Sequence, residues 1–447
     1  MNDRALRVLE QYDLEIRGTR RGRGSWYLDT AGGFRILSEY SASGNRAFFQ
    51  NFVMGKIRDG GYPNVDVILP NKEGALVSRD WEGNRYVVKE WYAGRECDAS
   101  NEPEILAAVE NLARLHRLME WNAEDFSGFS KVHEGGNQSP ALTGNGGEAG
   151  GCYPQGNPDG VPSGKGNAAM AQGRSEVQED VRSFSCGEPF GEGSAAAALG
   201  GTVSGGCGAA AAFGETVSRE GSAAAAFGET VSVEGGAAMD LGGMDFRRDY
   251  TARPPLDELC AWNAQLRKIR SFIRGRHRKS AFEQLFLDNF ERYYEQAREA
   301  REQLSLFNDR LEALRAAHDG SICHGDYSHH HVLMCGYEIA TTNFDRCCFD
   351  FQVNDLYRFM RKILEKHDWN VRLGMRMLDT YGRVRAIPWA ERKLLYVRML
   401  YPEKFRKLAG AYYGSNKAWI SRQYSDKLGK INRQEAARQE FVRALGN

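Results

Sequence analysis

Several features that would assign the chain to a functional class are missing from its 447 residues. The 59 basic and 59 acidic side chains cancel, so the composition does not predict the positive field of a nucleic-acid-binding protein. No apolar run approaches the roughly 18 residues of a membrane-spanning helix, and the N-terminal residues lack the apolar segment of a signal peptide. We therefore expect a cytoplasmic protein with no membrane span and no nucleic-acid partner.

The cysteines also lack a recognisable pattern. There are nine, an odd number, and they are scattered without CxxC spacing, which favours a reducing compartment over a disulfide framework. The adjacent Cys347 and Cys348 would be strained in a disulfide with each other, so we expect buried thiols.

Large aliphatic residues are almost absent from residues 133–248, which are rich in Gly, Ala and Ser. Such a segment buries too little apolar surface to offset the entropy lost on ordering, which predicts a disordered insertion. Within it, the segment from Ala209 to Ser218 recurs fourteen residues later, from Ala223 to Ser232. The repeat is either a weak tethering or self-association element or a slipped repeat without function, and composition favours the second interpretation.

The rest of the chain divides into parts with different patterns. Residues 1–90 alternate short strand-like runs with one helix at 45–58, and residues 91–132 contain a connection followed by a long helix at 103–120. Residues 249–447 are nearly all helical around one hairpin of strands. The pattern predicts an α+β fold with two lobes: a small mixed-sheet N-terminal lobe and a mainly helical C-terminal lobe.

A glycine- and arginine-rich run, Arg17 to Ser25, lies at a predicted hairpin of the first part. Backbone N–H groups at such a hairpin tip could close over phosphates. An ordinary hairpin with solvated arginines accounts for the same pattern, and the local signal favours it.

The most informative stretch is residues 321–361. In order, it contains His324-Gly325-Asp326 after a short apolar run, Val332-Leu333, a turn at Gly336, Asn343-Phe344-Asp345 after a strand-like run, and a helix that starts near Asn354-Asp355. Acidic residues at the ends of two strands joined by a tight hairpin converge in space. Enzymes collect carboxylates around a phosphate and its metal ions in this way.

These motifs resemble the aminoglycoside phosphotransferase and choline kinase superfamily, and more narrowly the CotS-type spore coat proteins of endospore-forming bacteria. The narrower resemblance rests on residues 89–98, 111–116 and 354–362, and it covers residues 1–130 and 250–447. It implies a protein-kinase-like fold, ATP and Mg²⁺ as the ligands of an active member, association with the spore coat, and other spore coat proteins as partners.

The resemblance assigns family roles to individual positions. Asp326 stands at the catalytic-loop aspartate that accepts the proton of the substrate hydroxyl, with His324 in the same loop. His331 stands where an asparagine would hold a metal ion, and Asn343 stands where an aspartate would, with Asp345 two residues further on.

The remaining positions concern the nucleotide and the loop itself. Ser38 stands at the lysine that binds the nucleotide phosphates, and Glu90, Trp91 and Tyr92 form the inter-lobe connection that would offer backbone groups to adenine. Asp355, at the start of a helix, is expected to be structural and to accept N–H bonds from the His324–Asp326 loop.

Three of these positions depart from the family pattern. Mg²⁺ prefers hard oxygen ligands, which the imidazole of His331 is not and which the amide of Asn343 supplies without charge. Ser38 carries no cation, and helix 45–58 contains no carboxylate that would hold one. Each such loss usually costs several kcal/mol of transition-state stabilisation. We therefore expect a pseudokinase scaffold in coat assembly, with an active phosphotransferase acting on a small molecule or protein through an altered metal site as the alternative.

Two alternative sets of residues could still bind a metal ion. Asp345 could serve as the metal ligand, with Arg23 or Arg35 replacing the missing lysine. Alternatively, His324 and the three consecutive histidines at 329–331 could bind Zn²⁺. Adjacent side chains in one loop cannot all reach a single ion without distortion, so incidental histidines are the favoured interpretation.

Overall fold

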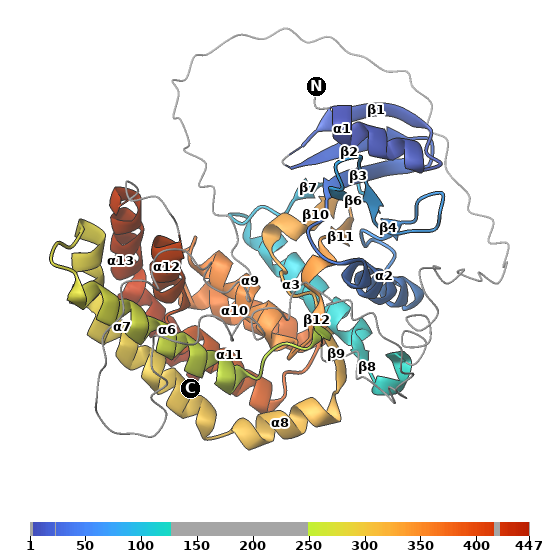
Figure 1. Ribbon diagram of the computed structural model, residues 1–447. Helices are drawn as coiled ribbons and strands as arrows, with labels where there is room; N and C mark the ends of the chain where they lie inside the picture. The colour runs from blue at the N-terminus through green and yellow to red at the C-terminus, as the bar shows by residue number, and fades with distance from the viewer. Residues whose placement is uncertain (1–2, 23, 127–248, 415–420, 447) are drawn as a thin grey trace, which may run out of the picture. The chain divides into compact units, whose positions relative to one another are not determined.

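The computed structural model describes residues 3–22, 24–126, 249–414 and 421–446, and Figure 1 labels its elements. The insertion expected at residues 133–248, with its repeats, lies outside the described residues, as does Arg23. No described helix is both long enough and apolar enough to cross a membrane. The six cysteines in the described ranges are free thiols.

A six-stranded antiparallel sheet forms the N-terminal part. Its strands are β1 (Ile16–Arg21), β2 (Ser25–Thr30), β3 (Gly33–Glu39), β4 (Ile68–Leu69), β5 (Ser78–Arg79) and β6 (Arg85–Glu90), in the order β1-β2-β3-β6-β4, with β5 also paired to β6. Strand β6 is central, and its register places Lys89 opposite Ile36 and Val87 opposite Ser38. The short helix α1 (Asp3–Arg7) precedes the sheet.

Helix α2 (Gly44–Asp59) follows β3, close to the expected range 45–58. Its first turn is capped by Ser43, whose side-chain oxygen accepts a hydrogen bond from Arg46 N. The buried side of the helix, including Phe49, Val53 and Ile57, joins one apolar core with Val87 of the central strand. Burial of this stripe therefore fixes the helix against the sheet.

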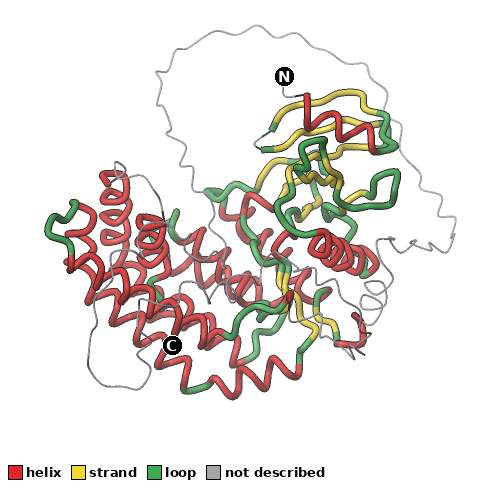
Figure 2. Tube along the Cα trace, viewed as in Figure 1, coloured by secondary structure: helices red, strands yellow, loops and turns green. Residues whose placement is uncertain are grey.

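The C-terminal part is mainly helical, as the red segments of Figure 2 show. Its helices are α3 (Glu102–Leu118), α6 (Pro255–Gly275), α7 (Ala281–Ser305), α8 (Asn308–Ala317), α9 (Val353–Leu364), α10 (Val371–Val384), α11 (Trp389–Leu400), α12 (Glu403–Gly414) and α13 (Ser421–Gly446). Helix α3 is capped by Asn101, whose side chain accepts a hydrogen bond from Glu104 N. Helix α8 was not anticipated from the sequence.

Two small sheets position the loops of the C-terminal part. One has the order β11-β10-β7 and the other β12-β9-β8, from strands β7 (Arg95–Glu96), β8 (Glu120–Trp121), β9 (Gly320–Cys323), β10 (Val332–Cys335), β11 (Glu338–Thr341) and β12 (Cys348–Phe349). The β10–β11 hairpin turns at Gly336, as the sequence predicts. Pairing with β7 and β8 is additional, and it ties residues 320–349 to the chain around α3.

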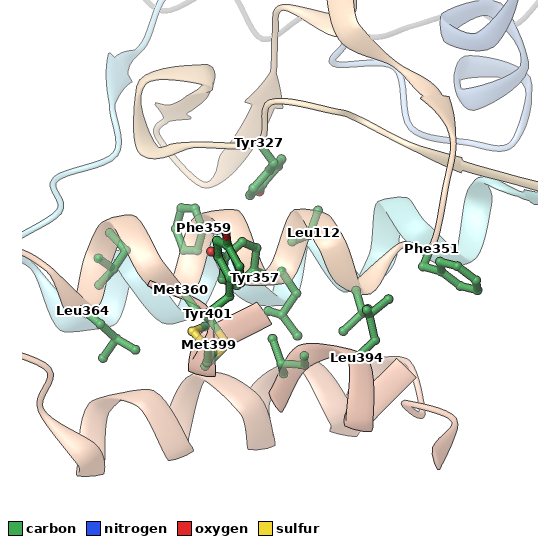
Figure 3. Packing of buried hydrophobic residues seen from close by; sticks show 14 of the residues in the cluster. Leu112, Tyr327, Phe351, Tyr357, Phe359, Met360, Leu364, Leu394, Met399 and Tyr401 are labelled. Carbon is green, nitrogen blue, oxygen red and sulfur yellow. The ribbon is translucent and has the colours of Figure 1, made fainter. Parts of the chain in front are cut away.

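A continuous apolar core lies beneath these loops (Figure 3). Tyr327 follows Asp326 directly and is fully buried, with its ring centroid 5.5 Å from that of Phe359 on α9. Its hydroxyl donates to the carbonyl oxygen of Ala108 on α3 at 2.8 Å. The residue after Asp326 therefore anchors the loop in the core.

Candidate functional site

The loop after β9 carries His324-Gly325-Asp326 and is held by the carboxylate of Asp355. Asp355 lies in the first turn of α9 and is fully buried. Its two oxygens accept hydrogen bonds from His324 N at 2.6 Å and Gly325 N at 3.0 Å, and Arg358 Nη1 lies 3.1 Å from Oδ1. Burial opposes the charged form, but the hydrogen bond from His116 and the charge of Arg358 lower the pKa of Asp355 to about 2.

Two other helices support this carboxylate through His116. The Nε2 atom of His116, on α3, lies 3.4 Å from Asp355 Oδ2, and its Nδ1 atom lies 2.6 Å from the hydroxyl of Tyr381 on α10. Burial lowers the pKa of His116, so the ring is neutral. The loop is thus held by α3, α9 and α10 together.

Gly325 is required by the path of the loop. Its φ angle is +85°, and a Cβ atom at this position would lie 1.9 Å from the carbonyl oxygen of Arg346. A side chain is therefore excluded by both conformation and space. This close approach brings the segment that follows β11 directly against the loop.

His324 orients the loop from within. Its Nε2 lies 2.9 Å from the carbonyl oxygen of Thr342, and its Nδ1 accepts a 3.3 Å hydrogen bond from Asp326 N. Burial lowers the pKa of His324 to about 4, so the neutral ring donates from one nitrogen and accepts at the other. Through these hydrogen bonds, His324 connects the loop to the residue that follows β11 and fixes their relative position.

Asp326 is partly exposed and faces Lys362 of α9. Lys362 Nζ lies 3.2 Å from Asp326 Oδ1, with 13% of the Asp326 side chain and 28% of the Lys362 side chain exposed. Burial would raise the pKa of Asp326, but Lys362 and the neighbouring His331 outweigh it and hold this pKa below its usual value. The carboxylate is therefore ionised and already paired.

The two positions that would supply metal ligands are bonded to each other. His331 Nδ1 donates to the carbonyl oxygen of Asp326 at 2.8 Å, so its Nε2 carries the lone pair, and Asn343 Nδ2 donates to that lone pair at 3.0 Å. Asn343 has a left-handed backbone, with φ 69° and ψ 55°, which asparagine tolerates better than most residues. Its backbone N–H donates to Asp66 Oδ2 at 2.9 Å.

Asp345 pairs with a buried lysine. Lys89 Nζ, from the central strand β6, lies 2.6 Å from Asp345 Oδ1 and 3.4 Å from Asp66 Oδ2. Gln50 of α2 donates to the same Asp345 oxygen at 3.0 Å. Burial lowers the pKa of Lys89, but the charges of Asp345 and Asp66 outweigh it and the net shift is upward. Burial raises the pKa of Asp66 to about 6.

Ser38 lies on β3 two residues from Ile36, the residue that faces Lys89 across the sheet. The cation beside Asp345 is thus Lys89 of β6, a residue for which the sequence predicted no role. Arg35 instead bonds the carbonyl oxygens of Phe34 and Gly32 at the exposed end of β3.

The inter-lobe connection, Glu90 to Tyr92, is tied to the N-terminal sheet. Glu90 N donates to Val67 O at 2.9 Å, and Trp91 N donates to Phe34 O at 3.1 Å. The Tyr92 hydroxyl donates to Val65 O at 2.8 Å. Two of the three backbone N–H groups expected to face adenine are therefore used within the sheet.

The three consecutive histidines point to different partners. Lys366 Nζ donates to His329 Nε2 at 3.0 Å, His330 Nδ1 lies 2.5 Å from Glu96 Oε2, and His331 bonds Asp326 as described. Within the described ranges, no three His, Cys, Asp or Glu side chains are grouped so that they could hold a metal ion.

Comparison with known proteins finds a family similarity in the C-terminal part of the chain. Residues 260–445 match the sequence model of the family described as "Spore coat putative kinase YutH". This part of the chain is therefore similar to that family, in agreement with the expected resemblance to spore coat kinase-like proteins. No curated protein matches the chain significantly in sequence.

A solved structure confirms the expected kinase-like fold. An aminoglycoside phosphotransferase from Alicyclobacillus acidocaldarius superposes with a TM-score of 0.62 at 14% identity, over 98% of this chain and 94% of that chain. A spectinomycin phosphotransferase in complex with ADP and spectinomycin covers 97% of each chain at 8% identity, with a TM-score of 0.49. At such low identity the first similarity establishes the fold alone: an N-terminal antiparallel sheet followed by a mainly helical part.

A kinase fold implies ATP and Mg²⁺, and the donor set of this chain does not fit the metal. Mg²⁺ requires several hard oxygen ligands in near-octahedral geometry. Here the two nearest positions offer an imidazole and an amide that bond each other, while Asp326 and Asp345 are each paired with a lysine. A metal ion would have to break two ion pairs to gain two carboxylates.

Two lysines of this site were missed by sequence reasoning. A signal for Lys89 exists, because β6 is otherwise a run of buried Tyr86, Val87 and Val88, and a cation in such a strand needs a buried partner. Lys362 lies seven residues after Asp355, two helical turns along the same face of α9, so it lies on the side of α9 that faces the loop.

Proposed function

We propose that this spore coat family protein is a pseudokinase scaffold in coat assembly, one that keeps the kinase architecture without efficient phosphoryl transfer. One observation carries the proposal: the groups that would act on a nucleotide and its metal are satisfied by one another. Asp326 is paired with Lys362, Asp345 with Lys89, and His331 with Asn343.

The replacements at the metal positions remove charge and a metal ligand. A kinase stabilises the transferring phosphoryl group with metal ions held by an aspartate and an asparagine. Replacing that aspartate by Asn343 removes a negative charge, and replacing the asparagine by His331 removes an oxygen ligand. Loss of one such group costs several kcal/mol of transition-state stabilisation, and two act together here.

The coat role rests on the family and on the composition of the chain. The Gly- and Ala-rich residues 133–248 offer a long segment, outside the kinase-like parts of the sequence, for contact with other spore coat proteins. The helical part would then serve as the folded body from which this segment makes its contacts.

The test compares the protein with a double variant that restores the family ligands, His331→Asn together with Asn343→Asp. Both proteins are melted with and without ATP and Mg²⁺ or Mn²⁺, and each is assayed for transfer of radiolabelled γ-phosphate. We expect metal-dependent stabilisation by ATP in the double variant and no transfer by the parent. Transfer of γ-phosphate by the parent to any acceptor would overturn the proposal.

Lys89 favours a second candidate, an active phosphotransferase with an altered site. Its buried ion pair with Asp345 supplies a lysine held by a carboxylate, the feature that Ser38 lacks. This candidate requires that Asp326→Asn abolish a measurable transferase or ATPase activity. It is rejected if that variant and the parent are indistinguishable. Nucleotide binding without turnover, with Glu90 to Tyr92 along the adenine, is separated from both by titration with a fluorescent nucleotide.

A further inference from the structure

Two lysines near the C-terminal end of α9 are directed at the loop that carries Asp326. Lys362 lies in the last turn of the helix, and Lys366 lies in the turn that follows it. Lys362 Nζ contacts Asp326 Oδ1 at 3.2 Å, and Lys366 Nζ contacts His329 Nε2 at 3.0 Å. The other cations of the helix are turned elsewhere, since Arg358 pairs with Asp355 and Arg361 with Glu365.

One carboxylate contacts this lysine pair directly. Asp326 is the ion-pair partner of Lys362, whereas Lys366 helps to lower the pKa of Asp98 and has no carboxylate of the described residues within ion-pair distance. The nearby Glu96 is engaged by His330. Arg346 adds further positive charge, because it helps to lower the pKa of Asp326.

His329 does not supply the missing negative charge. A lysine ammonium can only donate, so Nε2 of His329 must accept and the ring proton must lie on Nδ1. Burial and the neighbouring cations lower the pKa of His329 to about 3, which agrees with a neutral ring. Lys366 is thus held toward the loop by a neutral acceptor.

Both lysines have hydrogen-bond donors left for a ligand. Each ammonium group carries three donors, and each makes one side-chain contact here. Lys362 is partly exposed and Lys366 is exposed, so a dissolved anion can reach both. An anion bound between them would use the remaining donors.

We propose that Lys362 and Lys366 form a binding site for a phosphate group beside Asp326. The site takes a phosphate monoester or free phosphate, whose doubly charged form matches two ammonium groups. In the absence of a ligand, Asp326 occupies Lys362 as an internal competitor. A polycationic ligand is repelled at the same place.

The inference goes beyond the proposed function and does not depend on it, because the binding test uses neither nucleotide nor metal ion. The probes are inorganic phosphate and phosphoserine, titrated at ionic strength matched with chloride, with the melting temperature as the readout. Stabilisation by both identifies a phosphate site, and stabilisation by phosphoserine alone identifies an esterified ligand.

Variants that are expected to weaken phosphate binding, together with one that is expected to strengthen it, make the test specific. Lys362→Met and Lys366→Met should each weaken apparent phosphate affinity about tenfold, the value of one charge-assisted hydrogen bond. Lys362→Arg should retain binding, and Lys430→Met, at an exposed position on α13, should leave it unchanged. Asp326→Asn should bind phosphate more tightly than the parent, because the competitor for Lys362 is neutralised.

Three results would overturn the inference. The first is that phosphate does not stabilise the parent protein. The others are equal phosphate affinities of Lys362→Met and Lys430→Met, and weaker phosphate binding by Asp326→Asn than by the parent. If Lys362→Met does not fold, Lys362→Arg and Asp326→Asn still decide, since both preserve the size of the side chain they replace.

Discussion

Asp355 and Asp326 lie at opposite ends of one network, and the protein holds them very differently. Asp355 is fully buried and accepts bonds from two loop N–H groups as well as from Arg358. Asp326 is partly exposed and has one ion pair, with Lys362. Asp355 holds the backbone of the loop in place, and Asp326 is the residue that would act on a substrate. The contacts that shape a kinase loop are therefore complete here, whereas the groups that would perform the chemistry depart from the family pattern.

The largest effect is expected from breaking the network at Asp355. Asp355→Ala removes the acceptor for two buried N–H groups and the partner of a buried arginine, which should lower the free energy of unfolding by about 4 kcal/mol. Asp355→Asn, which keeps one acceptor, should lie between this variant and the parent. Denaturant unfolding with all three proteins measures the series.

Asp326→Ala is the matched control for that series. Because its side chain is partly exposed and makes a single ion pair, the change should alter the free energy of unfolding by less than about 1 kcal/mol. Equal losses at Asp326 and Asp355 would contradict the distinction between a structural and a chemical aspartate.

The structural half of the site could be predicted from the sequence because it is local. His324-Gly325-Asp326 follows a short strand, and Asp355 opens the next helix, so the hydrogen bonds from the loop to Asp355 were expected and are present. The main helices and the β10–β11 hairpin follow from apolar periodicity and a glycine turn in the same way. Prediction of the kinase-like fold required these elements together with the family motifs.

The paired lysines could not be predicted, because their partners are set by tertiary geometry. Lys89 reaches Asp345 only because β6 is the central strand and the segment after β11 packs beneath it, 256 residues along the chain. The family pattern has its cation at the β3 position that Ser38 occupies here, whereas the cation in this structure is Lys89 of the neighbouring strand β6. Pairing of β7 and β8 with the C-terminal strands was missed for the same reason, since two-residue strands carry no periodicity.

The two lysine–carboxylate pairs give the next contrast. Lys89 is almost fully buried between Asp345 and Asp66, so Lys89→Met leaves the buried Asp66 and the partly exposed Asp345 without a cation and should lower the free energy of unfolding by about 3 kcal/mol. Lys362→Met breaks a partly exposed pair and should cost less than about 1 kcal/mol. Unfolding curves at neutral pH compare the two variants. Similar losses of unfolding free energy would show that the Lys89 pairs stabilise the fold no more than the partly exposed pair of Lys362.

An effect smaller than those of Asp355→Ala and Lys89→Met is expected in the pH dependence of stability, and it arises at Asp66. Burial raises the pKa of Asp66 from 3.8 to about 6 in the folded protein, so the folded state binds this proton more tightly than the unfolded chain. The stabilisation from that proton is full below about pH 4 and is lost as pH rises through about 6. Asp66→Asn cannot ionise, so it should gain about 2 kcal/mol of unfolding free energy relative to the parent between pH 4 and pH 7. Asp379→Asn, on an exposed position of α10, should show no such gain, and parallel pH profiles for the parent and Asp66→Asn would mean that Lys89 keeps Asp66 ionised throughout.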